Sequence, residues 1–501
     1  MPLHPESDLA LERLCAGLEP AQRAVLAHDF ASEGPLLVLA GAGTGKTTTL
    51  TRRLALELAR NHPADQILAL TFTRKAAHEM RERVAGLLAA GSALPEIRTF
   101  HSLGLAILSE DGARGWKSAG WAFRPKLLSE ETEADESAKF WRERFREGAL
   151  SAPTAKAWTR MLAEWGDPQR CAQAGGHPSL EAWREWEAWK RRLGVAEMHD
   201  LISASLLALE SDPGLLERWR ARARTLFVDE YQDTDRTQYR LVSLLAGDSR
   251  RVMAVGDDDQ SIYGFRGADM RNILDWRSDR PDGRILTLTG NHRSRAPILA
   301  AANRVFPDKP PDFRKELQPR RKERGEPPLW FQAREPAEEL AWIRKRMEQE
   351  LRQGTPGSDL CALFRGNREE APLRKALRGL PVSRGDDQDG IRLLTIHAAK
   401  GLEWPAVFVC GQDREAREGR SLAPYQDDEE RRLFYVACTR ARDRLYLSSC
   451  ASRPKGKSPR EHVPHPWMDL VEPDVGIRPR WLVRTLRRFW HPAAARAIGD
   501  A

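Results

Sequence analysis

The chain has 501 residues, more than one ordinary domain holds, so we expect about two to four domains. Its 80 basic and 72 acidic residues give a formal net charge of +8, a modest basic excess that is compatible with nucleic acid without requiring it. The six cysteines form no CxxC pair, which argues against a zinc site and a disulfide framework, and neither an apolar run of bilayer length nor a signal-peptide pattern occurs. We therefore expect a cytoplasmic protein with no membrane segment.

A phosphate-binding loop is predicted after the first strongly apolar segment. Residues 36–40 have the composition of a buried strand, and GAGTGKT follows at 41–47. Glycines here let successive backbone N–H groups surround phosphate oxygens at a helix N-terminus. Lys46 is placed to reach the β- and γ-phosphates, and the Thr47 hydroxyl to hold Mg²⁺. The residues expected around the nucleotide are Ala40, Gly41, Ala42, Gly43, Thr44, Gly45, Lys46, Thr47 and Thr48.

Another buried strand, predicted at 225–230, ends in two carboxylates. In a P-loop protein the first, Asp229, orients Mg²⁺, and the second, Glu230, is placed to orient or deprotonate the attacking water. The alternative is an ordinary acidic turn. A further strand, 251–257, leads into a polar loop in which the Gln260 amide could sense a γ-phosphate. Three side chains of that loop could offer stacking faces to bases: Tyr263, Phe265 and Arg266.

The pattern of segments predicts two α/β domains. Strand and helix patterns alternate in residues 1–104 and resume in 197–295, which we assign to one domain. Residues 105–196 between them are charged and helical and hold eight of the sixteen tryptophans. Among these, the spacing of Trp183, Trp186 and Trp189 is close to one helix face and favours core packing over base stacking. A second α/β domain is predicted at 296–450, and a basic tail rich in proline and arginine at 451–501.

In combination these segments resemble the superfamily 1A DNA helicases of the UvrD/Rep/PcrA type. The resemblance covers roughly residues 18–447 and rests on motifs in a fixed order. They are the P-loop, TFTRKAAHEM (71–80), TFHS (99–102), VDEYQD (228–233), VGDDDQSIY (255–263), TIHAAKGLE (395–403) and YVACTRA (435–441). Three positions differ from the usual family residues: His292 stands in place of tyrosine, Arg74 in place of asparagine and Phe265 in place of tryptophan.

The resemblance implies an α/β fold of two RecA-like P-loop NTPase domains with parallel sheets, with ATP and Mg²⁺ in the cleft between them. Residues 105–196 would be the helical insertion called 1B in the first domain. The resemblance also assigns roles to residues outside the P-loop. Gln22 would read the adenine, His292 would stack on it, Glu403 would contact the ribose, Arg293 and Arg440 would approach the γ-phosphate, and Gln260 would link that phosphate to DNA.

For nucleic acid, the resemblance implies single-stranded DNA and single/double-strand junctions as partners. The implied contact residues are Phe72, His101, Tyr263, Phe265, Arg266 and His397. In the family a helical domain called 2B lies between a strand that corresponds to 360–364 and the TIHAAKGLE motif. Here only residues 365–390 lie there, so 2B is expected to be essentially absent, and a protein partner could replace it.

The first functional hypothesis is an ATP-dependent single-stranded DNA translocase or helicase that moves 3′ to 5′ in DNA repair, recombination or replication. The second is an ATP-gated DNA-binding subunit of a nuclease or anti-phage defence complex, with little unwinding of its own. A P-loop kinase would leave Arg440, Gln260 and the second α/β domain unexplained.

Overall fold

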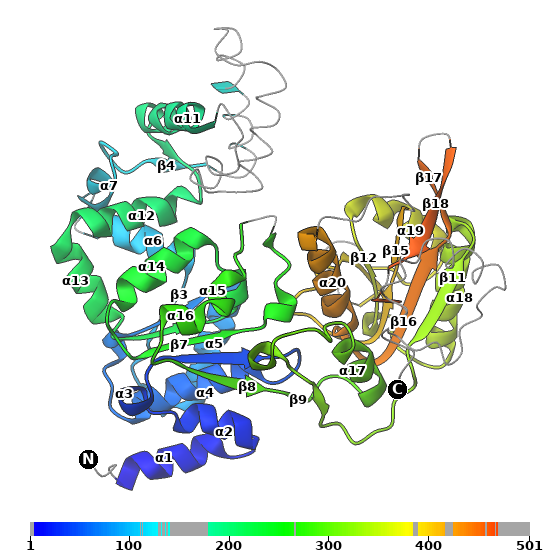
Figure 1. Ribbon diagram of the computed structural model, residues 1–501, viewed down its shortest axis with the longest axis horizontal. Coiled ribbons are helices and arrows are strands. Elements are labelled where there is room, and N and C mark those ends of the chain that lie inside the picture. Colours follow the sequence, from blue (N-terminus) through cyan, green and yellow to red (C-terminus); the bar gives the residue numbers. More distant parts are fainter. Residues whose placement is uncertain are drawn as a thin grey trace. The chain divides into compact units, whose positions relative to one another are not determined.

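The computed structural model describes residues 5–110, 112, 114–128, 132, 136, 139–140, 179–264, 267–383, 389–415, 424–455, 458–465 and 467–468. By their contacts the residues fall into two compact units (Figure 1). Unit 1 comprises Met1–Gly41 and Gly45–Leu288, and unit 2 comprises Ala42–Thr44 and Thr289–Ala501. Phe265, Arg266, most of the predicted 1B segment and the chain after residue 468 lie outside the described residues.

Unit 1 is built on a six-stranded parallel sheet in the order β3-β2-β6-β7-β1-β8. β1, β2, β6 and β7 are buried along their whole length, as expected of central strands covered on both faces. Residues Leu36–Leu39 of β1 pair with Met253–Gly256 of β7. The strands are β1 (Leu36–Ala40), β2 (Ile67–Thr71), β3 (Glu96–Thr99), β6 (Thr225–Val228), β7 (Val252–Gly256) and β8 (Arg284–Leu288).

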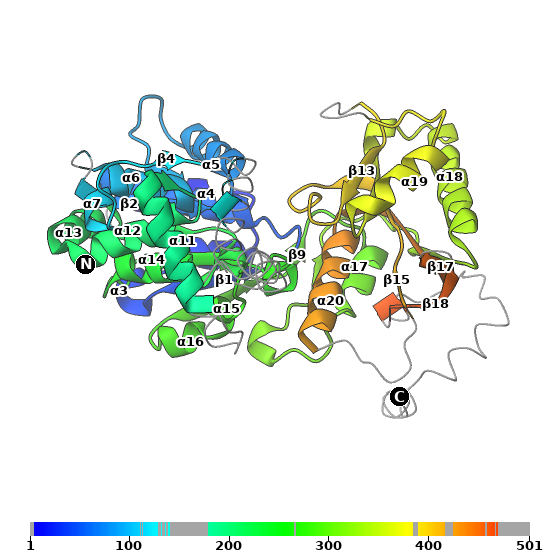
Figure 2. The same ribbon diagram turned by 90° about the horizontal axis from the view of Figure 1, so that it is seen from above.

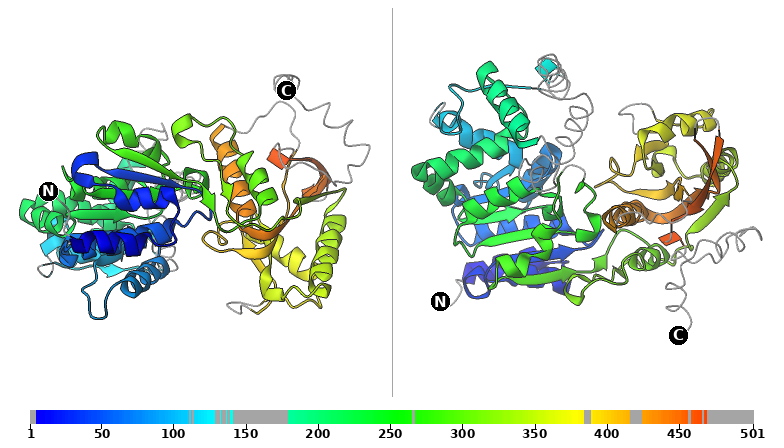
Figure 3. Two further views of the ribbon diagram at one scale, coloured as in Figure 1. Left: turned by 90° about the horizontal axis from the view of Figure 1, so that it is seen from below. Right: turned by 45° about the horizontal axis from the view of Figure 1, so that its top comes forward.

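Helices cover both faces of this sheet (Figures 1 and 3). Alternate strand residues pack with α2, α4 and α5 in one core, while α12, α13 and α14 lie on the opposite side. The helices are α1 (Pro5–Cys15), α2 (Pro20–Ala27), α3 (Phe30–Glu33), α4 (Lys46–Ala59), α5 (Arg74–Leu87), α6 (Phe100–Ser109), α7 (Arg114–Ser118), α11 (Ser179–Leu193), α12 (Asp200–Ser211), α13 (Pro213–Arg222), α14 (Arg236–Ala246), α15 (Arg271–Leu274) and α16 (Trp276–Asp279). The short elements are η1 (Ala64–Gln66), η2 (Tyr231–Asp233), η3 (Asp258–Gln260) and the paired β4 (Lys126–Leu127) and β5 (Val195–Ala196).

Unit 2 has a five-stranded parallel sheet in the order β11-β16-β14-β12-β13. α18 (Pro336–Arg352) and α19 (Glu370–Ala376) pack on one face, and α17 (Ala296–Asn303) and α20 (Pro424–Cys438) on the other (Figure 2). The strands are β11 (Leu329–Ala333), β12 (Leu360–Phe364), β13 (Arg392–Thr395), β14 (Trp404–Val409) and β16 (Ala441–Cys450). Short elements are β9 (Gly290–Asn291) paired with β10 (Gln318–Pro319), η5 (Pro311–Phe313), η6 (Gly357–Asp359) and η7 (Asn367–Glu369).

An antiparallel sheet of three strands adds to unit 2 in the order β15-β18-β17. It is formed by β15 (Asp413–Glu415), β17 (Ser452–Lys455) and β18 (Ser458–Pro464). Sequence reasoning did not predict this hairpin, which lies within the residues that it assigned to a basic tail. The predicted α/β fold with parallel sheets is confirmed.

Between α19 and β13, residues 381–383 are hydrogen-bonded to Ile391, which directly precedes β13. Val382 forms a parallel bridge with Ile391, Ile391 N donates to Pro381 O (2.7 Å) and Ser383 N donates to Ile391 O (3.0 Å). Residues 381–383, late in the 365–390 segment, are therefore hydrogen-bonded to Ile391, which directly follows that segment. Within the described ranges, no helix is both long and apolar enough to cross a membrane.

Candidate nucleotide and nucleic-acid sites

The P-loop joins β1 to α4, and two of its glycines have left-handed backbone. Gly43 and Gly45 have φ values of 66° and 78°, and Gly45 is the N-cap of α4. A Cβ on Gly45 would lie 2.7 Å from Gln22 Nε2, so a side chain there would force Gln22 to move. Lys46 is the first residue of the helix. The loop therefore presents backbone N–H groups and an ammonium at a helix N-terminus, an arrangement suited to phosphate.

Gln22, the predicted adenine contact, is buried beside this loop. It lies in α2, where its Oε1 accepts from Glu19 N (3.0 Å) in a capping box. That bond leaves the amide nitrogen directed at Gly45, since a Cβ placed on Gly45 would lie 2.7 Å from Gln22 Nε2. Its position next to the P-loop agrees with the predicted role, which stays a prediction.

Asp229 and Glu230 follow β6, at the same edge of the parallel sheet as the P-loop, where ligands of such sheets bind. Lys46 Nζ lies 3.9 Å from Glu230 Oε2. Glu230 has a φ of 50°, and among the described non-glycine residues only Asn61 shares a positive φ. Gln232 Nε2 donates to the Glu230 carboxylate. The strained backbone thus places the carboxylate beside Lys46.

Asp229 has the properties of a cation ligand. It is buried, its Oδ2 accepts weakly from Thr71 Oγ1 (3.5 Å), and its Oδ1 has no hydrogen-bond partner among the described residues. Burial, together with the neighbouring Glu230, raises the pKa of Asp229 to about 7. A bound cation would compensate this buried carboxylate. The oxygens of Asp229 and Thr47 are hard ligands of the kind that Mg²⁺ prefers, so the residues present fit the metal.

Gln232 connects the two acidic loops, a role that sequence reasoning missed. Its Oε1 accepts from Asp257 N (2.9 Å), while its Nε2 donates to Glu230. Gln260 Nε2 in turn donates to the Asp257 carboxylate, and Ser261 Oγ donates to Gln232 O (3.1 Å). One buried amide therefore links the Glu230 loop to the loop of Gln260. The signal in the sequence was the glutamine two residues after Glu230, but its partner becomes apparent only because β6 and β7 are neighbours.

Unit 2 brings three of the predicted nucleotide-contact residues together. The Arg293 guanidinium pairs with Glu403, and its Nη1 donates to Thr439 O (3.1 Å). Arg440 is buried: its Nε donates to Val436 O (3.0 Å) and its Nη1 to Leu402 O (3.2 Å). Both arginines therefore lie around the β14 and β16 starts, next to Glu403.

The tip of the P-loop, Ala42–Thr44, groups with unit 2 by its contacts. Asn291 Nδ2 donates to Ala42 O (2.7 Å), and Asn291 Oδ1 accepts from Arg293 N (2.9 Å). His292 is exposed, and its backbone N donates to Gly43 O (2.9 Å). Asn291, another residue that sequence reasoning did not assign, thus connects the loop tip to the segment that carries Arg293.

The predicted DNA contacts are only partly described. In unit 1, Phe72 and Tyr263 stack with ring centroids 5.5 Å apart and an interplanar angle of 12°, and both are half-buried. His101 is half-buried in α6, where burial, His199 and Arg74 lower its pKa. His397 is half-buried after β13 in unit 2. Phe265 and Arg266 lie outside the described residues, so the aromatic pair is the part of the predicted platform that can be located.

A P-loop at a helix N-terminus and an Asp-Glu pair at the same sheet edge define a P-loop nucleotide-binding protein. Comparison with known proteins gives the family. The UvrD/REP helicase N-terminal domain matches residues 18–281, and the UvrD-like helicase C-terminal domain matches residues 286–383 and 379–452. The chain belongs to the UvrD/REP helicase family, with two RecA-like domains.

Relatives named as ATP-dependent DNA helicases align with it. UvrD1 of Mycobacterium tuberculosis is 38% identical over 318 residues, which cover 59% of this chain and 40% of the relative. PcrA of Staphylococcus aureus is 33% identical over 354 residues, covering 69% and 47% respectively. The chain thus spans less than half the length of these two relatives.

UvrD2 of Mycobacterium tuberculosis aligns more broadly, at 28% identity over 592 residues that cover 94% of this chain and 84% of the relative. That alignment is longer than the 501 residues of the chain, so the relative carries sequence without a counterpart here.

Proposed function

We propose that the chain hydrolyses ATP with Mg²⁺ to move along single-stranded DNA in the 3′ to 5′ direction. The observation that carries the proposal is the grouping of Lys46 with Glu230, and with a buried Asp229 oxygen that lacks a partner among the described residues, at one edge of the unit 1 sheet. The direction and the pathway, which we place in DNA repair, recombination or replication, rest on the family alone.

The chemistry assigned to these residues is positioning and charge stabilisation, which dominate phosphoryl transfer. Lys46 and the loop N–H groups bind the β- and γ-phosphates, and Thr47 and Asp229 would hold Mg²⁺, which would neutralise phosphate charge. Glu230 accepts a proton from the attacking water. Arg293 and Arg440 stabilise the charge on the transferred phosphoryl group. Arg440 must exchange carbonyl partners for phosphate, so we expect nucleotide binding to rearrange its contacts.

On the DNA side, Phe72 and Tyr263 provide the stacking surface, and His101 and His397 contact the backbone. Stacking is sequence-tolerant, which suits a motor that must pass over any base. Gln260 couples this surface to ATP, and its link to Glu230 through Asp257 and Gln232 supports that role.

The second candidate is an ATP-gated DNA-binding subunit of a nuclease or anti-phage complex. The observation that favours it is the hydrogen-bonded return of the chain at Pro381–Ile391, which we interpret as the absence of a 2B domain. On this account a protein partner supplies the duplex contact. The two candidates differ in one property, since only the motor moves along DNA while it hydrolyses ATP.

The first test is the ATPase rate with and without a single-stranded oligonucleotide, with Lys46→Ala as the inactive control. We expect a strong stimulation that falls as salt rises, because the protein must displace counterions from the phosphates. An ATPase rate that does not respond to DNA would contradict the motor proposal.

A further inference from the structure

A cavity of about 640 Å³ opens in unit 1, within the size range of ligand pockets. Its walls include Ile67 and Thr225, the first residues of β2 and β6, and Arg251, which precedes β7. The strands are parallel, so this is the amino-terminal edge of the sheet, and the P-loop and the acids lie at the other edge. With strands of four or five residues the two edges are roughly 15 Å apart. The cavity is therefore separate from the nucleotide site.

The inner surface of the cavity is aliphatic. Ile67, Ala223, Leu245 and Ala246 are buried residues that line it, and Pro63 and Ala221 contribute exposed apolar surface. The residues that line it include no phenylalanine, tyrosine or tryptophan. Such a surface accepts an aliphatic side chain but provides no aromatic face on which a nucleic-acid base could stack.

Arginines dominate the polar part of the lining. The lining contains one acid, Glu217, and three arginines, which are Arg220, Arg224 and Arg251. Arg251 pairs with the buried Glu57, and Arg220 pairs with Glu217 (3.3 Å) and donates from Nε to Leu244 O (3.0 Å) near the C-terminus of α14. The contact with the C-terminus of α14 thus accounts for part of the hydrogen-bonding capacity of Arg220.

The side chain of Arg224 makes no such contact with the described residues. Its side chain is exposed and forms no hydrogen bond or ion pair within the described part of the chain, and only its backbone carbonyl is used, by Ser249 Oγ (3.1 Å). An arginine fork with no partner beside an apolar cavity is suited to bidentate binding of a carboxylate.

We infer that this cavity, which we call the Arg224 pocket, binds an acidic peptide segment of a partner protein. An aliphatic side chain of the peptide enters between Ile67, Ala221 and Leu245, and a flanking carboxylate pairs with Arg224. Charge complementarity and the aliphatic lining favour this occupant over nucleic acid. The site is independent of ATP turnover, so its test and that of the motor can fail separately.

The test is selection of peptides from a phage-displayed random 12-residue library on the full chain, followed by fluorescence polarisation with the selected peptides. We expect enrichment of leucine or isoleucine flanked by aspartate and glutamate. Arg224→Glu and the pocket-filling Ala221→Phe should each weaken binding at least about tenfold, or 1.4 kcal/mol. The matched control is Arg192→Glu, the same charge change at an exposed arginine of α11 outside the pocket, which should bind like the wild type. DNA-stimulated ATPase activity should be unchanged in all three variants.

Two outcomes would overturn the inference. One is the selection of peptides without an acidic-aliphatic pattern, or of peptides that bind both pocket variants as well as the wild type. The other is displacement of the bound peptide by a 12-nucleotide oligothymidylate in the wild type but not by excess unlabelled peptide, which would assign the pocket to nucleic acid. Because Ala221→Phe leaves the charge unchanged and Arg224→Glu leaves the cavity open, loss in both variants cannot come from one generic effect.

Discussion

At the scale of single residues, the backbone at Glu230 is the most informative feature. A left-handed φ of 50° costs a non-glycine residue of order 1–3 kcal/mol, and such strain is concentrated at functional sites. Here it orients a carboxylate toward Lys46, 3.9 Å away, and Gln232 holds it there. Asn61, with a φ of 60°, is the other described residue of this kind and lies beyond the C-terminal end of α4, where asparagine commonly adopts left-handed backbone.

Glu230→Gln should reduce kcat for ATP hydrolysis by about 10²–10⁴-fold, because it removes the proton acceptor but keeps the shape. Binding of a fluorescent ATP analogue should be preserved, unlike in Lys46→Ala, where a phosphate-binding cation is lost. Single-turnover hydrolysis measures the first effect and equilibrium titration the second. A normal turnover rate in Glu230→Gln would disprove its assignment as the base.

Tyr263→Ala should weaken binding of oligothymidylate by about 1–3 kcal/mol, since it removes one face of the pair that Tyr263 forms with Phe72. Tyr263→Phe keeps the ring and serves as the control that should bind normally. Fluorescence anisotropy at fixed salt measures both affinities. Equal affinity in Tyr263→Ala and the wild type would exclude this ring from the DNA surface.

Much of the site was predictable at this scale because its residues are close in sequence. GAGTGKT and Asp229-Glu230 each lie directly after a recognisable strand. Gln232 and Asn291 were not predicted, since their partners, Asp257 and Ala42, become neighbours only through the fold. The roles of Arg293, Arg440, Glu403 and His292 came from family resemblance, and no contact here tests them.

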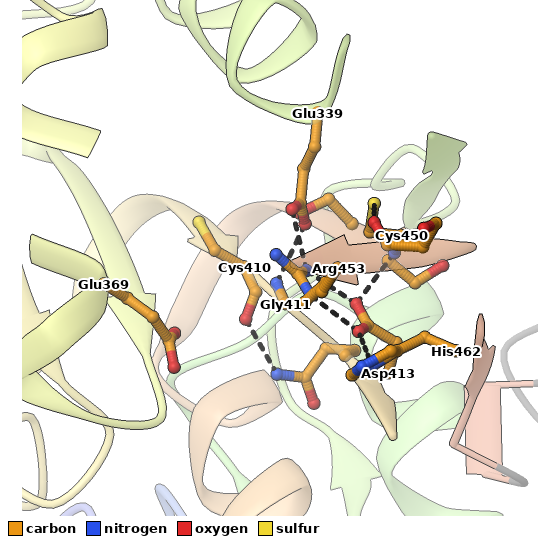
Figure 4. A network of polar contacts seen from close by, with 12 residues as sticks. Glu339, Glu369, Cys410, Gly411, Asp413, Cys450, Arg453 and His462 are labelled. Atoms are coloured by element: carbon orange, nitrogen blue, oxygen red, sulfur yellow. Dashed lines mark hydrogen bonds and ion pairs between the residues drawn. The ribbon is translucent and has the colours of Figure 1, made fainter. Parts of the chain in front are cut away.

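At the scale of elements, the β17–β18 hairpin was not predictable from hydrophobic pattern. The two strands, SRPK and SPREHVP, are polar and lack a strict alternation of apolar and polar residues. Charged contacts rather than apolar burial therefore hold them to the rest of unit 2. Arg453 of β17 pairs with Asp413 (2.6 Å) and with Glu339 of α18 (2.8 Å), and His462 of β18 contacts Asp413 (2.9 Å) (Figure 4). The two carboxylates are buried, and Arg453 is the cation between them.

Arg453→Met should destabilise unit 2 by about 3–5 kcal/mol, because it leaves two buried carboxylates without their shared cation. Arg352→Met is the matched control: it breaks an exposed pair with Glu348 on the same helix α18 (3.2 Å) and should cost no more than about 1 kcal/mol. Urea unfolding measures both. A similar small cost for the two variants would show that the Arg453 network does not hold the hairpin.

His465, directly after β18, should make stability depend on pH. Burial lowers its pKa to about 4, its Nδ1 has no hydrogen-bond partner among the described residues, and its ring stacks on Trp467 at 4.5 Å. The unfolded chain binds the proton near pH 6.5 and the folded chain only near pH 4. The contribution of His465 to the free energy of unfolding is therefore fully present above pH 6.5 and is lost as the pH falls toward 4.

Between pH 7 and pH 4 the free energy of unfolding should fall more in the wild type than in His465→Phe, by at most about 3 kcal/mol. His465→Phe keeps the ring stacking but cannot titrate. Chemical unfolding at several pH values measures this difference. Parallel curves for the two proteins would show that His465 titrates normally in the folded state.

At the scale of the whole molecule, alternation of strands and helices predicted the two parallel sheets. What sequence pattern could not supply is the function of a family member in which, on our proposal, the 2B domain is absent. Every residue assigned to ATP and DNA lies outside residues 365–390, where 2B would be inserted. Translocation should therefore persist, whereas the contact with the duplex should be lost. We therefore expect the isolated chain to unwind poorly under single-turnover conditions, and fast, processive unwinding of a long duplex by a monomer would contradict this.

The central claim is tested most directly by displacement of streptavidin from single-stranded DNA that carries biotin at either end. A motor that moves 3′ to 5′ should displace streptavidin from the 5′ end in an ATP-dependent manner, with little displacement from the 3′ end and none in Glu230→Gln. If the wild type hydrolysed ATP in response to DNA but displaced streptavidin from neither end, the protein would be an ATP-gated DNA-binding subunit, and the translocase account would be wrong.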